Sequence, residues 1–174
     1  MRASLKHYPG SSCEAVTAIA VEVRRDKDRL TLRYLASGNI AGLLLPRATA
    51  PRRADSLWQH TCFELFIGSA GTPAYYEFNF SPSTEWAAYR FSRYREGMQN
   101  LETAAPVIEA RPNANSFELN VSLDAASLPK SAWRVGISAV VEEAGKHKTY
   151  WALAHVAAKP DFHHPDSFTL ELPA

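Results

Sequence analysis

Cysteine and long apolar runs are both scarce in this sequence. Its two cysteines, Cys13 and Cys62, are too few for a disulfide scaffold, and a reducing compartment would keep them as thiols. No window approaches the roughly 20 apolar residues of a membrane span. A Pro-Gly pair and Glu14 come before the first apolar run, so the N-terminus lacks the core of a signal peptide. We therefore expect a cytoplasmic protein that does not enter a membrane.

An excess of one charge is also missing. Lysine and arginine number 19 against 18 acidic residues, for a net charge of +1, and no long run has a single sign. A nucleic-acid partner is therefore not expected, because such proteins usually present a basic face. The length of 174 residues and an apolar content of 46% predict a single domain, 1–174, with a substantial core.

Alternation with a period of two dominates the chain and predicts half-buried strands. It occurs at 19–23, 30–34, 60–67, 74–80, 85–91, 117–123, 135–141, 149–155 and 168–172. Turn residues separate these segments, with hairpins expected at 24–29 and 142–148. About nine short strands with such breaks predict an all-β fold, an antiparallel β-sandwich. Residues 39–57 contain two prolines and no clean period, and we interpret them as a long loop with a helical turn.

The stretch SLWQHTCFELFI, residues 56–67, combines two kinds of side chain. On one strand, side chains two residues apart share a face. One face would then carry Trp58, His60, Cys62 and Glu64, while Phe63 and its apolar neighbours would face the core. If 60–67 pairs with 74–80 as a hairpin, Glu77 and Asn79 join the polar face.

Two later strands add aromatic side chains to this face. Strand 85–91 would place either Trp86 or Tyr89 there, and strand 149–155 either Tyr150 or Trp151. Carboxylates, amides and imidazoles bind hydroxyl groups, and flat rings pack on the apolar face of a pyranose. The mixture indicates a sugar site. The alternative is a solvated sheet face whose polar groups bond one another or water.

Three segments together resemble the DOMON-like group, which is related to family 9 carbohydrate-binding modules. They are LWQHTCFELFI, YYEFNFSPSTEWAAYRFSRYREGM (75–98) and YWALAHVAAKPDFHHPDSFTLEL (150–172), and the similarity runs over residues 16–172. The resemblance implies a β-sandwich of about ten antiparallel strands with a ligand pocket at one sheet. In related modules the ligand is a sugar or a haem.

Family 9 modules hold a sugar end between two tryptophans, with charged and amide groups around it. The resemblance makes Trp58, Trp86 and Trp151 the tryptophan candidates, and it leaves open which of them form the pair. Its polar candidates are His60, Glu64, Glu77, Asn79 and Arg95, and His163 is a further candidate to cap the pocket. The missing secretion signal favours a small sugar or sugar derivative over a polysaccharide. We expect binding without catalysis and without a cofactor.

Several alternatives stay open. Met98 with His163 or His164 would ligate a haem for electron transfer. Glu64 with Glu77 or His60 would serve a sugar-modifying enzyme, although no nucleophile elbow or phosphate loop is present. A domain that binds only a protein partner is a further reading, and an exposed edge strand would allow a homodimer.

Overall fold

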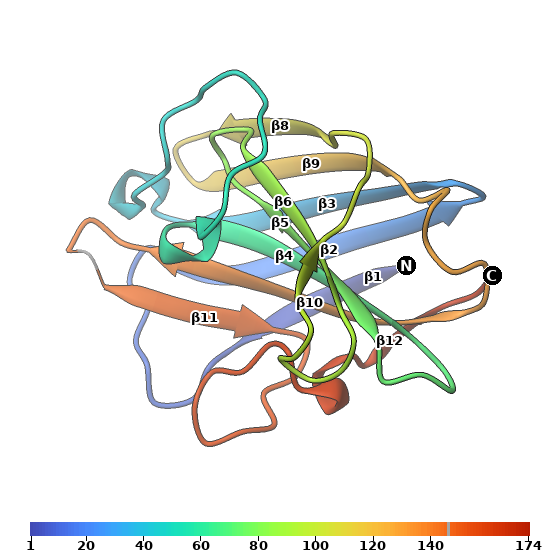
Figure 1. The fold of residues 1–174 in the computed structure, drawn as a ribbon. Coiled ribbons are helices and arrows are strands. Elements are labelled where there is room, and N and C mark those ends of the chain that lie inside the picture. The colour runs from blue at the N-terminus through green and yellow to red at the C-terminus, as the bar shows by residue number, and fades with distance from the viewer. Residues whose placement is uncertain (146) are drawn as a thin grey trace.

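The computed structural model describes residues 1–145 and 147–174. Within them the chain forms twelve strands and three short 3₁₀ turns (Figure 1). The strands are β1 (Arg2–His7), β2 (Val16–Asp26), β3 (Arg29–Gly38), β4 (Cys62–Ser69), β5 (Tyr75–Phe80), β6 (Trp86–Phe91), β7 (Gln99–Asn100), β8 (Val107–Pro112), β9 (Ser116–Asp124), β10 (Trp133–Glu142), β11 (Lys148–Ala152) and β12 (Leu170–Leu172). The turns are η1 (Ile40–Gly42), η2 (Leu57–Gln59) and η3 (Pro165–Ser167).

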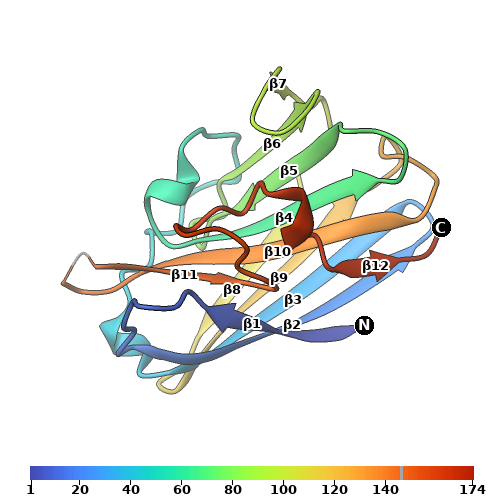
Figure 2. The same ribbon diagram turned by 90° about the horizontal axis from the view of Figure 1, so that it is seen from below.

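The strands form one curled antiparallel sheet with the order β7-β6-β5-β4-β10-β11-β1-β2-β3-β9-β8, and β12 pairs with β10. Strand β1 pairs with both β11 and β2, so it joins the two layers. The layer β1-β2-β3-β9-β8 packs against the layer that contains β4, β5, β6 and β10 (Figures 1 and 2). This arrangement confirms the predicted antiparallel β-sandwich.

The apolar core lies between the layers. Strand β4 contributes Phe63, Leu65 and Ile67 to it, each at most 1% exposed. Tyr34 of β3 packs on the Phe63 ring and donates a hydrogen bond of 3.1 Å across the core to the carbonyl of Glu64. Because side chains alternate along β4, Cys62, Glu64 and Phe66 point away from this core, to the outer face. The two faces predicted for this strand are therefore present from Cys62 onward, where β4 begins.

The sequence predicted nine of the strands, and it missed β1, β7 and β8. Both hairpins form, as β2-β3 and β10-β11, although Lys146 in the second lies outside the described residues. The segment 39–57 is mostly irregular, with η1 near its start and the first residue of η2 at its end. No helix in the described ranges is long and apolar enough to cross a membrane.

Candidate functional site

The outer face of the β4-β5-β6-β10 layer carries a pocket of about 670 Å³. Its walls come from strands, from the segment before β4, from the β6-β7 connection and from the C-terminal segment. The lining residues are Asp55, Ser56, Trp58, Glu64, Glu77, Tyr89, Phe91, Arg95, Met98, Asn100, Val140, Tyr150, Pro160, Phe162 and His163. The volume lies within the range of sites for small ligands.

Two buried carboxyl groups form the floor of this pocket. Glu64 of β4 is 3% exposed and Glu77 of β5 is 6% exposed. Glu64 lies opposite Asn79 in the β4-β5 pair, so Glu77 is its diagonal neighbour on the same face. Ser138 Oγ donates to Glu64 Oε2 at 2.9 Å, and Asn79 Nδ2 donates to Glu77 Oε1 at 2.7 Å. These bonds fix both carboxyl groups in place.

The second oxygen of each carboxyl group is left without a hydrogen-bond donor among the described residues, although His163 Nε2 lies 3.8 Å from Glu77 Oε2. Neither Glu64 Oε1 nor Glu77 Oε2 accepts a hydrogen bond from the described residues. Among those residues, the fully covered side-chain atoms without a partner are Arg25 Nε, Arg53 Nε and Trp86 Nε1. Both carboxyl oxygens therefore reach the pocket, where they are available to a ligand that carries donors.

Arg95 and His163 also line the pocket, beside the floor. Arg95 Nη2 donates to Asp161 Oδ1 at 2.8 Å. The Tyr75 hydroxyl accepts a bond from the Arg95 backbone N–H and lies within hydrogen-bond distance of His163 Nδ1, at 2.8 Å. The other ring nitrogen, His163 Nε2, lies 3.8 Å from Glu77 Oε2. The histidine ring is thus held in a fixed orientation beside the floor.

Burial shifts the protonation of these groups. Burial and the nearby Glu77 carboxyl raise the pKa of Glu64 to about 8, and burial also raises the pKa of Glu77. Burial and the Arg95 charge lower the pKa of His163 to about 4. At neutral pH the free site therefore holds a largely protonated Glu64 and an uncharged His163. Perturbed groups of this kind in a cleft are typical of functional sites.

Aromatic rings form the rim. Trp58 lies on η2 and is 52% exposed, which is unusual for so large an apolar side chain. Its neighbour Leu57 packs on the small apolar cluster around Phe66 and holds the turn against the sheet. Tyr150 and Phe162 add further rings, with centroids 6.2 Å apart. The rim therefore offers flat surfaces above a polar floor.

The C-terminal segment between β11 and β12 runs across β4 and β10 (Figure 2). It contributes Pro160, Phe162 and His163 to one side of the pocket. It is anchored by Phe168, whose ring stacks on Phe66 with centroids 5.7 Å apart. Gly68 of β4 and Gly136 of β10 leave room for that ring: an added Cβ would lie 3.4 Å from it at Gly68 and 2.6 Å at Gly136. The docked segment brings Pro160, Phe162 and His163 to the pocket.

Two of the predicted tryptophans do not belong to the site. Trp86 pairs with Phe80 and turns into the core between the layers, and Trp151 pairs with the core residue Ala139 and does the same. Neither lines the pocket, because the strand register places the alternate residues Tyr89 and Tyr150 on the outer face. The period of two leaves both rings of each strand open, and it is the resemblance to family 9 modules that favours the tryptophans.

The remaining predicted residues fall into two groups. Trp58, Glu64, Glu77, Arg95 and His163 all line the pocket. Asn79 is 1% exposed and lies behind Glu77, so it positions the carboxyl group without facing the pocket. His60 lies outside the lining: β4 begins at Cys62, and His60 turns to bond Glu142 at 2.7 Å. Trp58 and His60 therefore do not share a strand face with Glu64.

Several lining residues were not chosen from the sequence. Asp55, Ser56 and Asn100 come from irregular or very short segments, where no period places a side chain. Ser56 has φ of 61°, a left-handed conformation that no motif signals. Tyr89 and Tyr150 were detectable, since the period of two gave each an even choice. Met98 is a candidate from the sequence only as a haem ligand. In the structure it lines the pocket together with His163.

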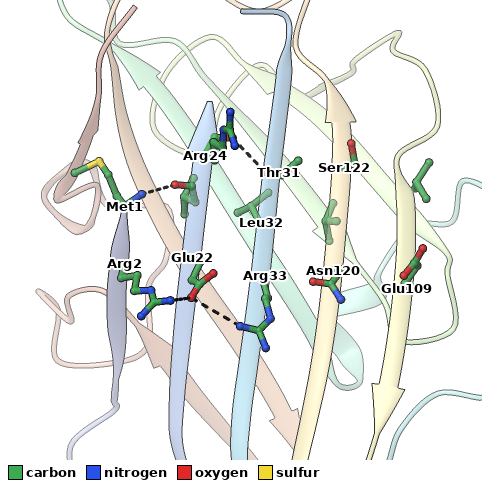
Figure 3. A pocket seen from close by; sticks show the side chains of 13 residues that line it. Met1, Arg2, Glu22, Arg24, Thr31, Leu32, Arg33, Glu109, Asn120 and Ser122 are labelled. Carbon is green, nitrogen blue, oxygen red and sulfur yellow. Dashed lines mark hydrogen bonds and ion pairs between the residues drawn. The ribbon is translucent and has the colours of Figure 1, made fainter. Parts of the chain in front are cut away.

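A second hollow lies on the outer face of the other layer (Figure 3). It measures about 460 Å³ and crosses β1, β2, β3, β9 and β8. Two of its arginines pair with Glu22, which lies 2.7 Å from Arg2 and 3.7 Å from Arg33 (Figure 3). No aromatic side chain lines it. The pocket above Glu64 and Glu77 is therefore the stronger candidate. Within the described ranges no group of three or more His, Cys, Asp or Glu is arranged to hold a metal ion.

Comparison with known proteins places the fold. No protein-family model matches the sequence, and no curated protein sequence is significantly similar to it. The structure is similar to that of a candidate carbohydrate-binding protein from Bacteroides uniformis, with a TM-score of 0.69, 15% identity, and coverage of 97% of this chain and 84% of that one. It is also similar to a family 9 carbohydrate-binding module from Caldicellulosiruptor kristjanssonii in complex with cellotriose, with a TM-score of 0.54, 9% identity, and coverage of 88% and 72%. At these identities the likeness establishes a shared β-sandwich fold.

Proposed function

We propose that this protein binds a small saccharide or sugar derivative in the pocket above Glu64 and Glu77. One observation carries the proposal: a half-exposed indole, Trp58, stands over a floor of two buried, hydrogen-bonded carboxyl groups. Rings pack on the C–H face of a pyranose, and carboxyl oxygens accept from its hydroxyl groups. The fold shared with a family 9 module in complex with cellotriose supports the same ligand class.

The proposed mechanism is recognition without turnover. Ser138 and Asn79 hold the two carboxyl groups before a ligand arrives, so little ordering is needed on binding. The Trp58 ring supplies apolar contact. The Tyr89 hydroxyl donates to Asp55 at 2.6 Å and so holds the Asp55 carboxyl group in place beside the floor. We propose that the ligand is a short sugar, because the C-terminal segment closes one side of the pocket.

The polar floor argues against a haem. Met98 and His163 both line the pocket, as a haem-binding reading requires. A porphyrin packs its faces on apolar surface, whereas Asp55, Glu64 and Glu77 place three carboxyl groups in this lining. His163 is also already engaged by Tyr75 and faces Glu77. These residues do not fit a haem, and they do fit a ligand rich in hydroxyl groups.

A tryptophan-fluorescence titration tests the proposal. The protein has four tryptophans, and Trp86, Trp133 and Trp151 are each at most 7% exposed, so a sugar in the pocket should perturb the emission of Trp58. The panel comprises neutral, acidic and amino monosaccharides and disaccharides and sugar phosphates. We expect a saturable change with at least one class.

Trp58→Phe is the matched variant for this titration. It keeps an aromatic surface and removes the reporting indole, so calorimetry should still detect binding while the fluorescence response disappears. A saturable response that persists in Trp58→Phe would move the ligand to another place. The absence of binding to every sugar in the panel, by both methods, would reject the proposed function.

A further inference from the structure

The charges around the pocket are unbalanced. Asp55, Glu64 and Glu77 line it, and Asp161 lies directly beside it, which makes four carboxyl groups. The cationic group among the lining residues is Arg95. The imidazole of His163 is uncharged at neutral pH, since burial lowers its pKa to about 4. The site therefore contains more negative than positive charge once its carboxyl groups ionise.

The single guanidinium is already paired with a carboxylate through Nη2, while half of its side chain stays exposed. Arg95 is bound to Asp161, whose other oxygen accepts from the Tyr94 hydroxyl at 2.5 Å. The side chain of Asp161 is only 8% exposed, so this ion pair is shielded from water on the side of the carboxylate. An acidic sugar would have to compete with Asp161 for this guanidinium, and its negative charge would gain nothing from the floor carboxyl groups, which become negative when they ionise.

The open acceptors favour a ligand with a positive charge. Glu64 Oε1 and Glu77 Oε2 both reach the pocket and accept nothing from the described residues. They belong to diagonal neighbours on adjacent strands, so one small donor can approach both. An ammonium group presents three donors and a full charge, and a hydroxyl presents one donor. Exposed rings such as Trp58 attract cations as well.

We propose that the pocket prefers a saccharide that carries a free ammonium group, an amino sugar, over neutral and acidic sugars. The inference rests on the proposed function and names the substrate class of the same site. The ammonium lies between the free oxygens of Glu64 and Glu77, while the remaining hydroxyls meet Asp55 and the rim. Glu64, held protonated in the free protein by burial and by Glu77, ionises when the cation arrives.

Calorimetry at pH 6.5 and low ionic strength tests this preference with five probes. They are glucose, glucosamine, 6-amino-6-deoxyglucose, N-acetylglucosamine and glucuronic acid. We expect one of the two amino sugars to bind about tenfold or more tightly than glucose, and glucuronic acid to bind more weakly. N-acetylglucosamine, which keeps the nitrogen but loses the charge, should lose the advantage. Binding of the amino sugar should release protons, seen as a dependence of the heat on the buffer.

Two isosteric variants assign the effect to the floor. Glu64→Gln and Glu77→Gln each remove one ionisable group, and at least one should bring the affinity for the amino sugar down to that for glucose. Glu142→Gln is the matched control. Glu142 is 7% exposed and lies on β10, on the same face of the sheet as Glu64, but it bonds His60 and does not line the pocket. It should leave the preference intact.

The outcomes separate the two proposals. Amino sugars that bind no more tightly than glucose would overturn the preference and leave saccharide binding standing. A preference that survives both glutamine variants would also overturn it, since the charge would then come from elsewhere. Absence of binding for all five probes, together with the fluorescence panel, would reject both proposals.

Discussion

At the scale of single residues, the four tryptophans divide by exposure. Trp58 stands on a 3₁₀ turn with half of its surface in solvent, whereas Trp86, Trp133 and Trp151 are buried in the core. Trp133 carries the guanidinium of Arg25 over its ring, at 3.6 Å from the centroid. A tryptophan left in solvent loses the free energy that its burial would give. Its position at the pocket is a reason for that exposure.

Trp58→Ala should separate binding from stability. We expect the affinity for a sugar that binds the pocket to fall by about 1–3 kcal/mol, because the ring surface is lost. The free energy of unfolding should change by less than about 0.5 kcal/mol, as for other exposed positions. Calorimetry and urea denaturation measure the two quantities.

Trp151→Phe provides the opposite pattern. Its indole is 5% exposed and packs on His7 with ring centroids 4.9 Å apart, so the smaller ring should lower stability and leave the affinity of the folded protein unchanged. An affinity loss of the same size in both variants would contradict the assignment of the two tryptophans.

At the scale of elements, the C-terminal segment between β11 and β12 depends on a close fit. Its Phe168 lies over Gly136 and Gly68 and joins the apolar cluster that also holds Tyr75 and Phe91. This cluster is separate from the core between the layers, so it adds a second apolar contact on the outer face. The segment that carries His163 is positioned through it.

Gly136→Ala tests this fit. The added Cβ would lie 2.6 Å from the Phe168 ring, so the ring must move and the segment with it. We expect a loss of stability of about 1–3 kcal/mol from overpacking, together with weaker sugar binding. The matched variant Gly68→Ala places its Cβ at an ordinary 3.4 Å from the same ring and should change both quantities little. Equal effects of the two substitutions, by denaturation and calorimetry, would contradict the account.

At the scale of the whole molecule, the period of two determined what the sequence could predict. It predicted the sandwich, the β4-β5 hairpin and the common face of Glu64, Glu77 and Asn79. It did not predict β1, which is six residues long and follows directly from the N-terminus. Irregular segments carry no period, so the position of Asp55 in the pocket could not be predicted from the sequence. The neutral state of His163 depends on its burial, which only the packed structure shows. Which of Trp151 and Tyr150 faces the pocket could be decided only from the pairing register of β11 with β10.

The curled sheet also makes the floor of the pocket a stability determinant. The layer that holds Glu64 packs on the opposite layer through Phe63 and Tyr34, and Tyr34 bonds the backbone of Glu64 itself. Its carboxyl group lies on the outer face but is only 3% exposed, so a charge there is largely desolvated. Its ionisation should be felt in the free energy of unfolding of the entire domain.

The sign of this pH dependence follows from linkage. The pKa of Glu64 rises from its ordinary value of 4.5 to about 8 on folding, so between these values the folded chain holds the extra proton and stability falls as pH rises. His163, with its pKa lowered to about 4, acts in the opposite direction only below about pH 6.5. Between pH 6.5 and 8 we expect urea denaturation to show a loss of up to about 2 kcal/mol. Glu64→Gln should remove most of this loss, and an unchanged slope in that variant would assign the titration to another group.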